Sequence, residues 1–222
     1  MTSRRSRAGS RVLVVAKAPV AGLAKTRLAR DVGFERAAEL AAASLLDTLR
    51  ASAEAVGVAS CHLALTGDLR AAARSDDLAS ALAGWTVHKQ RGPDFASRLA
   101  HAHLSMPADR AVVQIGMDTP QLCAADLVSA GDLTGEHDAV LGPALDGGWW
   151  VLAMRDPGRS AGLATVPMSS PTTYDDTWRA LEHAGLRVGP TSELRDVDTV
   201  EDAEAVAHQA PDTEFARAWR DR

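Results

Sequence analysis

The residues best suited to chemistry lie in a loop that follows the first apolar segment of the chain. Residues 12–16 are apolar without interruption, which is typical of a buried parallel strand. The loop after them carries Lys17, Lys25 and Arg27 together with Gly22, and helix-favouring sequence follows. Cations and free backbone N–H groups between a strand and a helix can bind phosphate oxygens. A plain turn with surface lysines is the alternative, and a Walker A loop is excluded because it needs two glycines at fixed spacing.

Three aspartates stand where a divalent metal could bind. Asp118 follows a second apolar segment at 111–116, and Pro120 rigidifies the turn after it. One carboxylate together with nucleotide phosphate oxygens is a common way to hold Mg²⁺. Asp196 and Asp198 stand two residues apart, so in an extended segment they face the same side, where like charges favour a nearby cation. For all three, capping of a following helix is the alternative.

The most unusual segment is 143–150, Pro-Ala-Leu-Asp-Gly-Gly-Trp-Trp. Its paired glycines let the backbone approach a ligand closely, Asp146 offers an acceptor or a metal ligand, and Trp149 or Trp150 can stack on a sugar or a base. The alternative is a tight hairpin turn followed by an aromatic strand. Because neighbouring side chains of a strand face opposite sides, at most one tryptophan is expected to line a pocket, while the other packs in the core or against a helix.

Apolar segments of strand length alternate with amphipathic segments of helix length along the chain. Strands are predicted at residues 12–16, 61–66, 85–88, 111–116, 139–142, 149–154 and 188–197, and helices at 33–52, 76–82, 95–105, 124–133, 173–184 and 199–208, with a long loop at 155–172. This order predicts an α/β fold, a single-domain doubly wound, mostly parallel sheet with helices on both faces. Ligands bind beyond the carboxyl ends of such strands, so the loops at 17–27, 116–120, 142–148 and 196–199 are expected to converge there.

Length and composition predict one folded domain. We expect a disordered basic tail at 1–10, the domain at 11–210 and a C-terminal tail at 211–222. The net charge is −5, and setting aside the four arginines before residue 12 leaves −9, which excludes a nucleic-acid-binding surface. Cys61 and Cys123 form no C-x-x-C pair, so reduced thiols are expected rather than a zinc or redox motif. No apolar run is long enough to span a membrane, and a cytoplasmic location is expected.

Five motifs, in this order along the chain, together resemble those of a known family. They are Lys17-x-Pro19-x-x-Gly22-x-x-Lys25-Thr26-Arg27-Leu28, Gln90-x-Gly92-x-Asp94-Phe95-x-x-Arg98, Gly116-x-Asp118-x-Pro120, Gly142-Pro143-Ala144-x-Asp146-Gly147-Gly148 and Asp196-Val197-Asp198-Thr199-x-x-Asp202. They look like the radical-SAM-associated transferase family, labelled a glycosyltransferase in some settings, and are similar to the phospholactate or phosphoenolpyruvate guanylyltransferases of deazaflavin-cofactor synthesis. The resemblance spans residues 11–208 and implies the nucleotide-diphospho-sugar transferase (GT-A) fold.

The resemblance also implies roles for individual residues. The nucleotide would be bound by Lys17, Pro19, Gly22, Lys25, Thr26, Arg27, Gln90, Asp94 and Arg98. The acceptor would be bound by Gly142, Pro143, Asp146, Gly147, Gly148, Trp149 and Trp150. A divalent metal, Mg²⁺ or Mn²⁺, would be held by Asp118, Asp198 and Asp196. Lys25, Asp118 and Asp146 are then the expected catalytic residues. The chain departs from the family at Trp149-Trp150, where pairs such as Tyr-Tyr are more usual, and at Phe95 and Ser97, where leucine and glutamate are expected.

Two reactions fit these residues. Glycosyl transfer from a nucleoside-diphospho-sugar to a small acceptor is favoured by the tryptophan pair and by the family's usual label. Nucleotidyl transfer, in which the acceptor attacks the α-phosphorus of an NTP, is favoured by the basic loop, because Lys25 and Arg27 could stabilise departing pyrophosphate. A non-catalytic nucleotide-binding protein is the third alternative, which loss of the acidic metal residues would signal, and Asp118 and Asp198 are present. The expected partners are a nucleotide or nucleotide sugar and a small-molecule acceptor, with no nucleic acid and no membrane.

Overall fold

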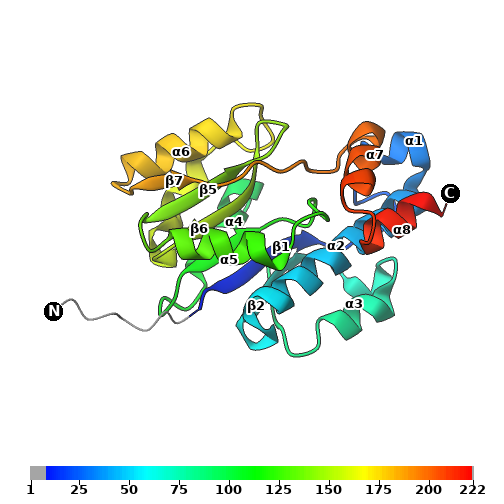
Figure 1. The fold of residues 1–222 in the computed structure, drawn as a ribbon, viewed down its shortest axis with the longest axis horizontal. Coiled ribbons are helices and arrows are strands. Elements are labelled where there is room, and N and C mark those ends of the chain that lie inside the picture. Colours follow the sequence, from blue (N-terminus) through cyan, green and yellow to red (C-terminus); the bar gives the residue numbers. More distant parts are fainter. Residues whose placement is uncertain (1–8, 222) are drawn as a thin grey trace.

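A seven-stranded sheet runs through the protein (Figure 1). The order of its strands is β3-β2-β1-β4-β6-β5-β7. The computed structural model describes residues 9–221, so most of the predicted tail at 1–10 lies outside the described residues. The strands are β1 (Arg11–Lys17), β2 (Cys61–Thr66), β3 (Thr86–Lys89), β4 (Val112–Ile115), β5 (Ala139–Pro143), β6 (Trp149–Met154) and β7 (Val188–Pro190). β6 runs antiparallel to β4 and β5, whereas the other neighbouring pairs are parallel.

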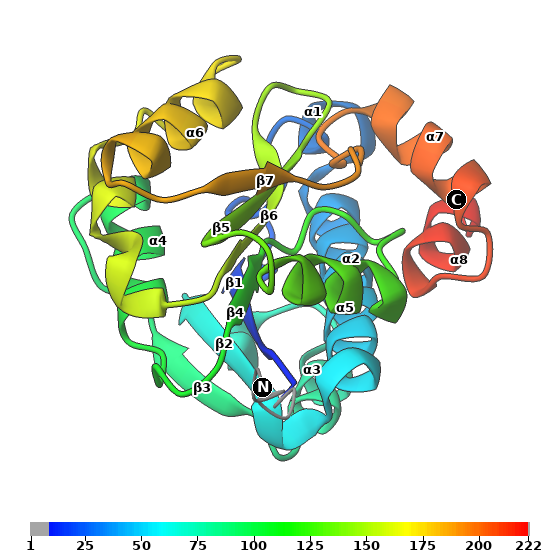
Figure 2. The same cartoon turned by 60° about the vertical axis from the view of Figure 1, so that its left-hand side comes forward.

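Helices cover both faces of the sheet. They are α1 (Ala29–Val32), α2 (Phe34–Val56), α3 (Ser75–Ala81), α4 (Phe95–Leu104), α5 (Ala124–Leu133), α6 (Thr173–His183), α7 (Val200–Gln209) and α8 (Glu214–Arg220), with 3₁₀ turns η1 (Val58–Ser60), η2 (Leu69–Ala71) and η3 (Pro157–Thr165). Figure 2 shows α2 and α5 on one face, and α4 and α6 on the other. The predicted fold class, a single-domain α/β fold with a mostly parallel sheet, is confirmed.

The first strand is apolar throughout because both of its faces are covered. Val12, Val14 and Ala16 belong to the core cluster shared with α2 and α5, whereas Leu13 and Val15 belong to the cluster shared with α4. Alternate side chains of a strand face opposite sides, so a strand between two helical layers needs apolar residues at every position. This packing fixes the direction of β1 and therefore the place at which the basic loop begins.

The last strand was predicted at 188–197, and this prediction was wrong because the observed strand is much shorter. β7 ends at Pro190, which has no N–H to donate to a neighbouring strand. The chain then continues as an irregular segment that touches the turn after β5 through one isolated bridge, between Ala144 and Leu194. The acidic residues at 196–198 therefore stand in an extended connection between β7 and α7 rather than at the end of a strand.

The C-terminal segment, predicted as a tail from residue 211, contains the packed helix α8. Phe215 is fully buried and Trp219 nearly so, in a cluster with α2 and α7. Asp47 on α2 accepts hydrogen bonds from the backbone N–H groups of Glu214 and Phe215, at 3.0 and 2.8 Å. A carboxylate at a helix N-terminus stabilises the helix. The segment was not recognised in the sequence because it is too short to show a helical period.

The other ends of the elements agree with prediction to within a few residues, and η3 occupies part of the long predicted loop at 155–172. Among the described residues, no helix combines the length and the apolar character needed to cross a bilayer.

Candidate active site

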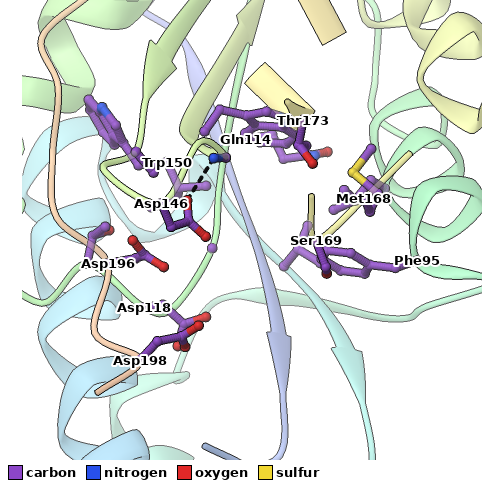
Figure 3. A pocket seen from close by; sticks show the side chains of 18 of the residues that line it. Phe95, Gln114, Asp118, Asp146, Trp150, Met168, Ser169, Thr173, Asp196 and Asp198 are labelled. Carbon is purple, nitrogen blue, oxygen red and sulfur yellow. Dashed lines mark hydrogen bonds between the residues drawn. The ribbon is translucent and has the colours of Figure 1, made fainter. Parts of the chain in front are cut away.

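A pocket lies at the edge of the sheet where β1, β4 and β5 end and β6 begins (Figure 3). Its volume is about 240 Å³, and its walls come from the segments after β4 and β5, the segment 196–198, the start of α4 and the residues before α6. The loops 116–120, 142–148 and 196–199 thus converge, although they are far apart in sequence. The loop 17–27 joins them through the contacts of Lys25 and Arg27.

Four carboxylates gather at one end of the pocket, which we call the charged end: Asp118, Asp146, Asp196 and Asp198. Burial, with added repulsion from Asp146 and the other two carboxylates, raises the pKa of Asp196 to about 6. Burial also raises the pKa of Asp198, although Lys25 and Arg27 act in the opposite direction. Like charges this close repel one another, so the charged end favours a bound cation.

Lys25 joins three segments of the charged end. Its ammonium group donates hydrogen bonds to the Asp118 carboxylate and to the backbone carbonyl of Val197. The Lys25 side chain is only 3% exposed, whereas the Asp118 side chain is 50% exposed, so the ion pair is buried on the side of the lysine and open to water on the side of the carboxylate. The backbone of Lys25 has φ +48°, a left-handed conformation that costs a non-glycine residue about 1 kcal/mol. The strain is offset by the contacts that it makes possible.

The rest of the basic loop is more open. Arg27 donates to a carboxylate oxygen of Asp198 at 2.9 Å, and its side chain is 68% exposed. Lys17, Gly22 and Thr26 are exposed, and Pro19 is buried. None of these residues lines the pocket, but the loop borders the charged end through the contacts of Lys25 and Arg27.

Three predicted nucleotide-binding residues lie outside the pocket and have structural contacts. Gln90 donates hydrogen bonds to the carbonyl oxygens of Ala16 and Ala64, at 2.9 and 3.0 Å, and so joins the ends of β1 and β2. Asp94 accepts from the backbone N–H of Ser97 and caps α4. The Arg98 guanidinium lies 5.9 Å from the centre of the Phe95 ring. The structure therefore does not bring these three together with the carboxylates.

The charged end has the right chemistry for Mg²⁺ or Mn²⁺, which bind oxygen ligands. Within residues 9–221, no group of three or more histidine, cysteine, aspartate or glutamate side chains is arranged to hold an ion by itself. An ion held by one or two carboxylates and by the phosphates of a nucleotide needs fewer protein ligands, and this smaller set fits Asp118 and Asp198.

The segment 143–150 forms a hairpin turn between β5 and β6, which is the alternative that the sequence left open for this segment. Asp146 accepts a hydrogen bond from the N–H of Gly148 at 2.7 Å, which stabilises the turn. Gly147 has φ +88°, and a Cβ there would lie 2.1 Å from the carbonyl oxygen of Pro171. Gly142 faces the Trp150 indole, since an added Cβ would lie 2.5 Å from its Nε1. These glycines are required by packing, and Pro143 lies at the irregular pairing of this turn.

The two tryptophans differ in burial. Trp150 is 3% exposed, packs in the core, and donates from Nε1 to the carbonyl oxygen of Ser192 at 2.8 Å. Trp149 is half-buried and donates to the Thr177 hydroxyl at 3.2 Å. Both nevertheless contribute to the pocket. The prediction that at most one would line it was wrong, because the pocket lies where β6 begins and both of the first two residues of the strand border it.

Sequence motifs did not point to the other end of the pocket, which we call the uncharged end, although Phe95 belongs to the second of the five motifs. It is formed by Phe95, Gln114, Met168, Ser169 and Thr173. Gln114 is fully buried in β4, and its Oε1 accepts a hydrogen bond from Nδ1 of His103 at 3.2 Å. Burial lowers the pKa of His103 to about 4, so the ring is neutral at pH 7. One signal was present in the sequence: Gln114 is a polar residue inside an otherwise apolar strand.

Comparison with known proteins extends these observations. The sequence model of a family described as "Uncharacterized protein conserved in bacteria (DUF2064)" matches residues 48–170, more than half of the chain. This range includes Asp118, Asp146, Gln114 and both tryptophans of the hairpin. No curated protein matches the chain in sequence.

Solved structures share the fold over almost the whole chain. One is a provisionally named nucleotide-diphospho-sugar transferase from Desulfovibrio desulfuricans G20, with 24% identity, a TM-score of 0.81, and coverage of 95% of this chain and 94% of that one. A second is CMP:2-keto-3-deoxy-manno-octonic acid synthetase complexed with CTP, with 13% identity, a TM-score of 0.58 and coverage of 96% and 99%. A third is Rv0371c from Mycobacterium tuberculosis H37Rv in complex with manganese, with 17% identity, a TM-score of 0.50 and coverage of 89% and 98%. At these identities the likeness establishes the fold.

Proposed function

The chain belongs to the family of uncharacterized bacterial proteins DUF2064, and we propose that it is a transferase that acts on a nucleotide substrate. The reaction that we favour is glycosyl transfer from a nucleoside-diphospho-sugar to a small acceptor. The observation that carries this proposal is the direct contact between Lys25 of the basic loop and Asp118 of the charged end, beside a pocket that contains Trp149. A phosphate-binding loop, a cation-binding carboxylate and a stacking surface are the parts that this reaction needs.

In this proposal the nucleotide phosphates lie between the basic loop and the charged end. Lys25 and Arg27 already contact carboxylates, so phosphate oxygens would add to or replace those contacts without large movement of the loop. The cavity of about 240 Å³ is smaller than the roughly 300 Å³ at which drug-sized sites begin. It suits the transferred group and the acceptor, with the nucleoside outside it and nearer to the loop.

Asp118 and Asp198, with Asp196 beside them, would hold Mg²⁺ or Mn²⁺. When bound, such an ion stabilises the negative charge that develops on the leaving diphosphate. The manganese in the related Rv0371c structure supports this assignment.

Two further residues would act on the sugar and the acceptor. The half-exposed face of Trp149 offers a surface on which a sugar ring can stack. Asp146 uses Oδ1 in the turn, and its Oδ2 makes no hydrogen bond to the described residues, so this oxygen could accept the proton of an attacking hydroxyl.

Nucleotidyl transfer to a small phosphorylated acceptor, as in the guanylyltransferases that the motifs resemble, is the second candidate. The basic loop supports it, since two cations suit a departing pyrophosphate, and a synthetase with the same fold binds CTP. The resemblance to the radical-SAM-associated family supports the first candidate. A purely nucleotide-binding role is the least favoured, because it has no use for the four carboxylates.

The proposal is tested by mixing the purified protein with Mg²⁺ or Mn²⁺ and a panel of NTPs and nucleoside-diphospho-sugars, and by measuring thermal stability. A ligand that binds only the folded state adds about 2.7 kcal/mol of apparent stability at a hundredfold excess over Kd. We expect stabilisation by at least one nucleoside-diphospho-sugar, dependent on the metal, followed by release of nucleoside diphosphate when an acceptor is added. Stabilisation by NTPs alone, with pyrophosphate released, would favour the second candidate, and no stabilisation by any nucleotide would reject both.

A further inference from the structure

The uncharged end of the pocket contains a hydrogen-bond donor without a partner. Gln114 is fully buried, and its Nε2 makes no hydrogen bond to the described residues. Buried amide groups almost always have a partner, so an orphan at a pocket wall needs an explanation. The orientation of the side chain is nevertheless fixed, because its Oε1 accepts a hydrogen bond from His103.

His103 determines which atom of the amide faces the pocket. The ring is fully buried on α4 and neutral, and its Nδ1–H donates to Oε1 of Gln114. An amide has one oxygen and one NH₂ group, so engaging the oxygen with His103 leaves the buried NH₂ group without a partner, in a side chain that lines the pocket. A donor fixed in this way selects a ligand with an accepting oxygen at that position.

The remaining walls of this end are apolar or carry hydroxyl groups. Phe95 and Met168 lie here with Ser169 and Thr173, away from the four aspartates (Figure 3). Phe95 is 44% exposed, which is unusual for a large apolar side chain and leaves part of its surface free for a ligand. The Thr173 hydroxyl is already used, since it donates to the carbonyl oxygen of Pro167 at 3.0 Å. Among these polar side chains Gln114 is the one that is fully buried and has a donor without a partner.

Charge further restricts the ligand. Among the described residues that line the pocket there are four aspartates and no lysine, arginine or histidine. Lys25 and Arg27 contact carboxylates of the charged end, and Arg98, whose guanidinium lies 5.9 Å from the centre of the Phe95 ring, is not among the residues that line the pocket. A phosphate or carboxylate at the uncharged end would face carboxylates without a cation to pair with, which is unfavourable for a desolvated anion.

We propose that the uncharged end binds the acceptor, and that the acceptor is a small neutral molecule that carries both hydroxyl groups and an apolar face. One of its oxygens accepts a hydrogen bond from Nε2 of Gln114, and its apolar face lies against Phe95 and Met168. Gln114 is thus a specificity-determining residue, and His103 is a positioning residue that acts through it. This inference rests on the proposed transferase function and narrows its substrate class, since it disfavours phosphorylated acceptors.

The test compares neutral molecules with their phosphorylated counterparts, under conditions in which the nucleotide site is filled. The probes are two pairs: glycerol with glycerol 3-phosphate, and methyl glucoside with glucose 6-phosphate. They are added to the full-length protein with Mn²⁺ and the nucleoside diphosphate that stabilises it most, and probe binding is titrated by ligand-observed NMR. We expect the neutral member of each pair to bind more tightly. Tighter or equal binding of the phosphorylated member in both pairs, or binding of no probe, would overturn the inference.

Substitutions at Gln114 assign the selectivity to its amide. Gln114→Met keeps the length of the side chain and removes both hydrogen bonds, and should weaken binding of the neutral probes by roughly tenfold. Gln114→Glu keeps the acceptor for His103 and loses the donor to the ligand, so it should weaken the same probes even if the Met variant fails to fold. The matched control is Gln121→Met, because Gln121 also has one buried amide atom without a partner but does not line the pocket. Wild-type affinity in a folded Gln114 variant would overturn the role of the donor.

The same samples separate this inference from the proposed function. Stabilisation by the nucleotide and metal is recorded before any acceptor probe is added. If it is absent in the wild-type protein, the proposed function fails. If it is present and the neutral probes are not preferred, the transferase function stands and the acceptor inference alone fails.

Discussion

The two ends of the pocket are built in different ways. At the charged end, the carboxylates stand on turns and connections at the sheet edge and are held in place by cations from the basic loop. At the uncharged end, Gln114 stands inside β4, and the other walls come from α4 and from the residues before α6. The charged end places carboxylates where a metal and phosphates could bind. The uncharged end offers a largely apolar surface and one hydrogen-bond donor, Nε2 of Gln114. The difference suggests that chemistry and acceptor choice are separable in this protein, which mutations can test.

The largest effect is expected at the charged end, from Asp118→Asn. The change removes a charge that the proposed metal needs and keeps the shape, so turnover should fall by roughly a thousandfold with the fold intact. Steady-state kinetics at saturating Mg²⁺ or Mn²⁺ measure this. Asp109→Asn is the matched control, because Asp109 also pairs with an arginine, Arg11, but lies outside the pocket. Unchanged turnover in Asp118→Asn would reject the metal role.

The next largest effect is on stability and concerns the tryptophan that packs between the core and the pocket. Trp150→Ala should lower the free energy of unfolding by about 3–5 kcal/mol, because the side chain is almost fully buried and its loss leaves a cavity. Chemical denaturation measures the change. Trp149→Ala is the comparison, and it should cost clearly less because Trp149 is only half-buried. Equal losses of stability would mean that both side chains are structural.

Arg27→Ala sharpens the comparison within the charged end, because Arg27 is exposed and its removal spares the contacts of Lys25. Loss of one charge-assisted hydrogen bond should weaken nucleotide binding by roughly tenfold or more. Titration calorimetry with an NTP and its NDP measures both losses. A larger loss for the NTP would support nucleotidyl transfer, and equal losses would count against it.

A smaller effect is expected where the two ends meet, at Trp149. If a sugar stacks on the indole, Trp149→Phe should keep much of the activity, whereas Trp149→Leu should lose about tenfold in kcat/KM, because an aromatic face rather than bulk binds the ring. Kinetics of the two variants with the same donor and acceptor decide this. If leucine serves as well as phenylalanine, the stacking role is wrong.

The last prediction concerns stability rather than activity, and is a pH dependence at the uncharged end. The pKa of His103 is about 4 in the folded protein and 6.5 in the unfolded chain, so the unfolded state binds the proton first as pH falls. Stability contributed by neutral His103 is complete above pH 6.5 and is lost toward pH 4, at up to about 1.4 kcal/mol per pH unit.

Unfolding free energies of the wild type and of His103→Leu, measured from pH 7 to about pH 4, isolate this term. Their difference should shrink or reverse as the pH falls, and contributions from the carboxylates cancel in the subtraction. A difference that is constant with pH would show that His103 does not remain neutral in the folded state.

Much of the fold and the charged end could be predicted from the sequence, for a physical reason. A strand that is buried on both faces is apolar at every position, so Val12 to Ala16 identified both β1 and the loop that follows it. Turns at the end of strands expose their polar side chains, so Asp118 and Asp146 were recognised by position and type. The end of β7 was misjudged because the segment after Pro190 pairs with its neighbour only at an isolated bridge, and the sequence does not distinguish such a segment from a regular strand.

The uncharged end could not be predicted, because no local pattern connects its residues. Phe95 begins a helix, Gln114 lies within a strand and Met168 follows a 3₁₀ turn, and only the folded chain brings them together. Gln90 and Asp94 show the reverse case, in which a sequence motif predicted binding residues that the structure does not place in the pocket. They fit a binding motif, yet the structure uses Gln90 to join two strands and Asp94 to cap a helix.

The position of Lys25 has a thermodynamic consequence for the order in which ligands bind. Its ammonium group neutralises Asp118 while no phosphate is present, so a cation that binds Asp118 must compete with Lys25. A phosphate that attracts Lys25 releases Asp118 for the cation, and a cation on Asp118 releases Lys25 for the phosphate. By linkage, each ligand then raises the affinity of the other by the same factor. Metal and nucleotide should accordingly bind with positive cooperativity, and neither should bind tightly alone.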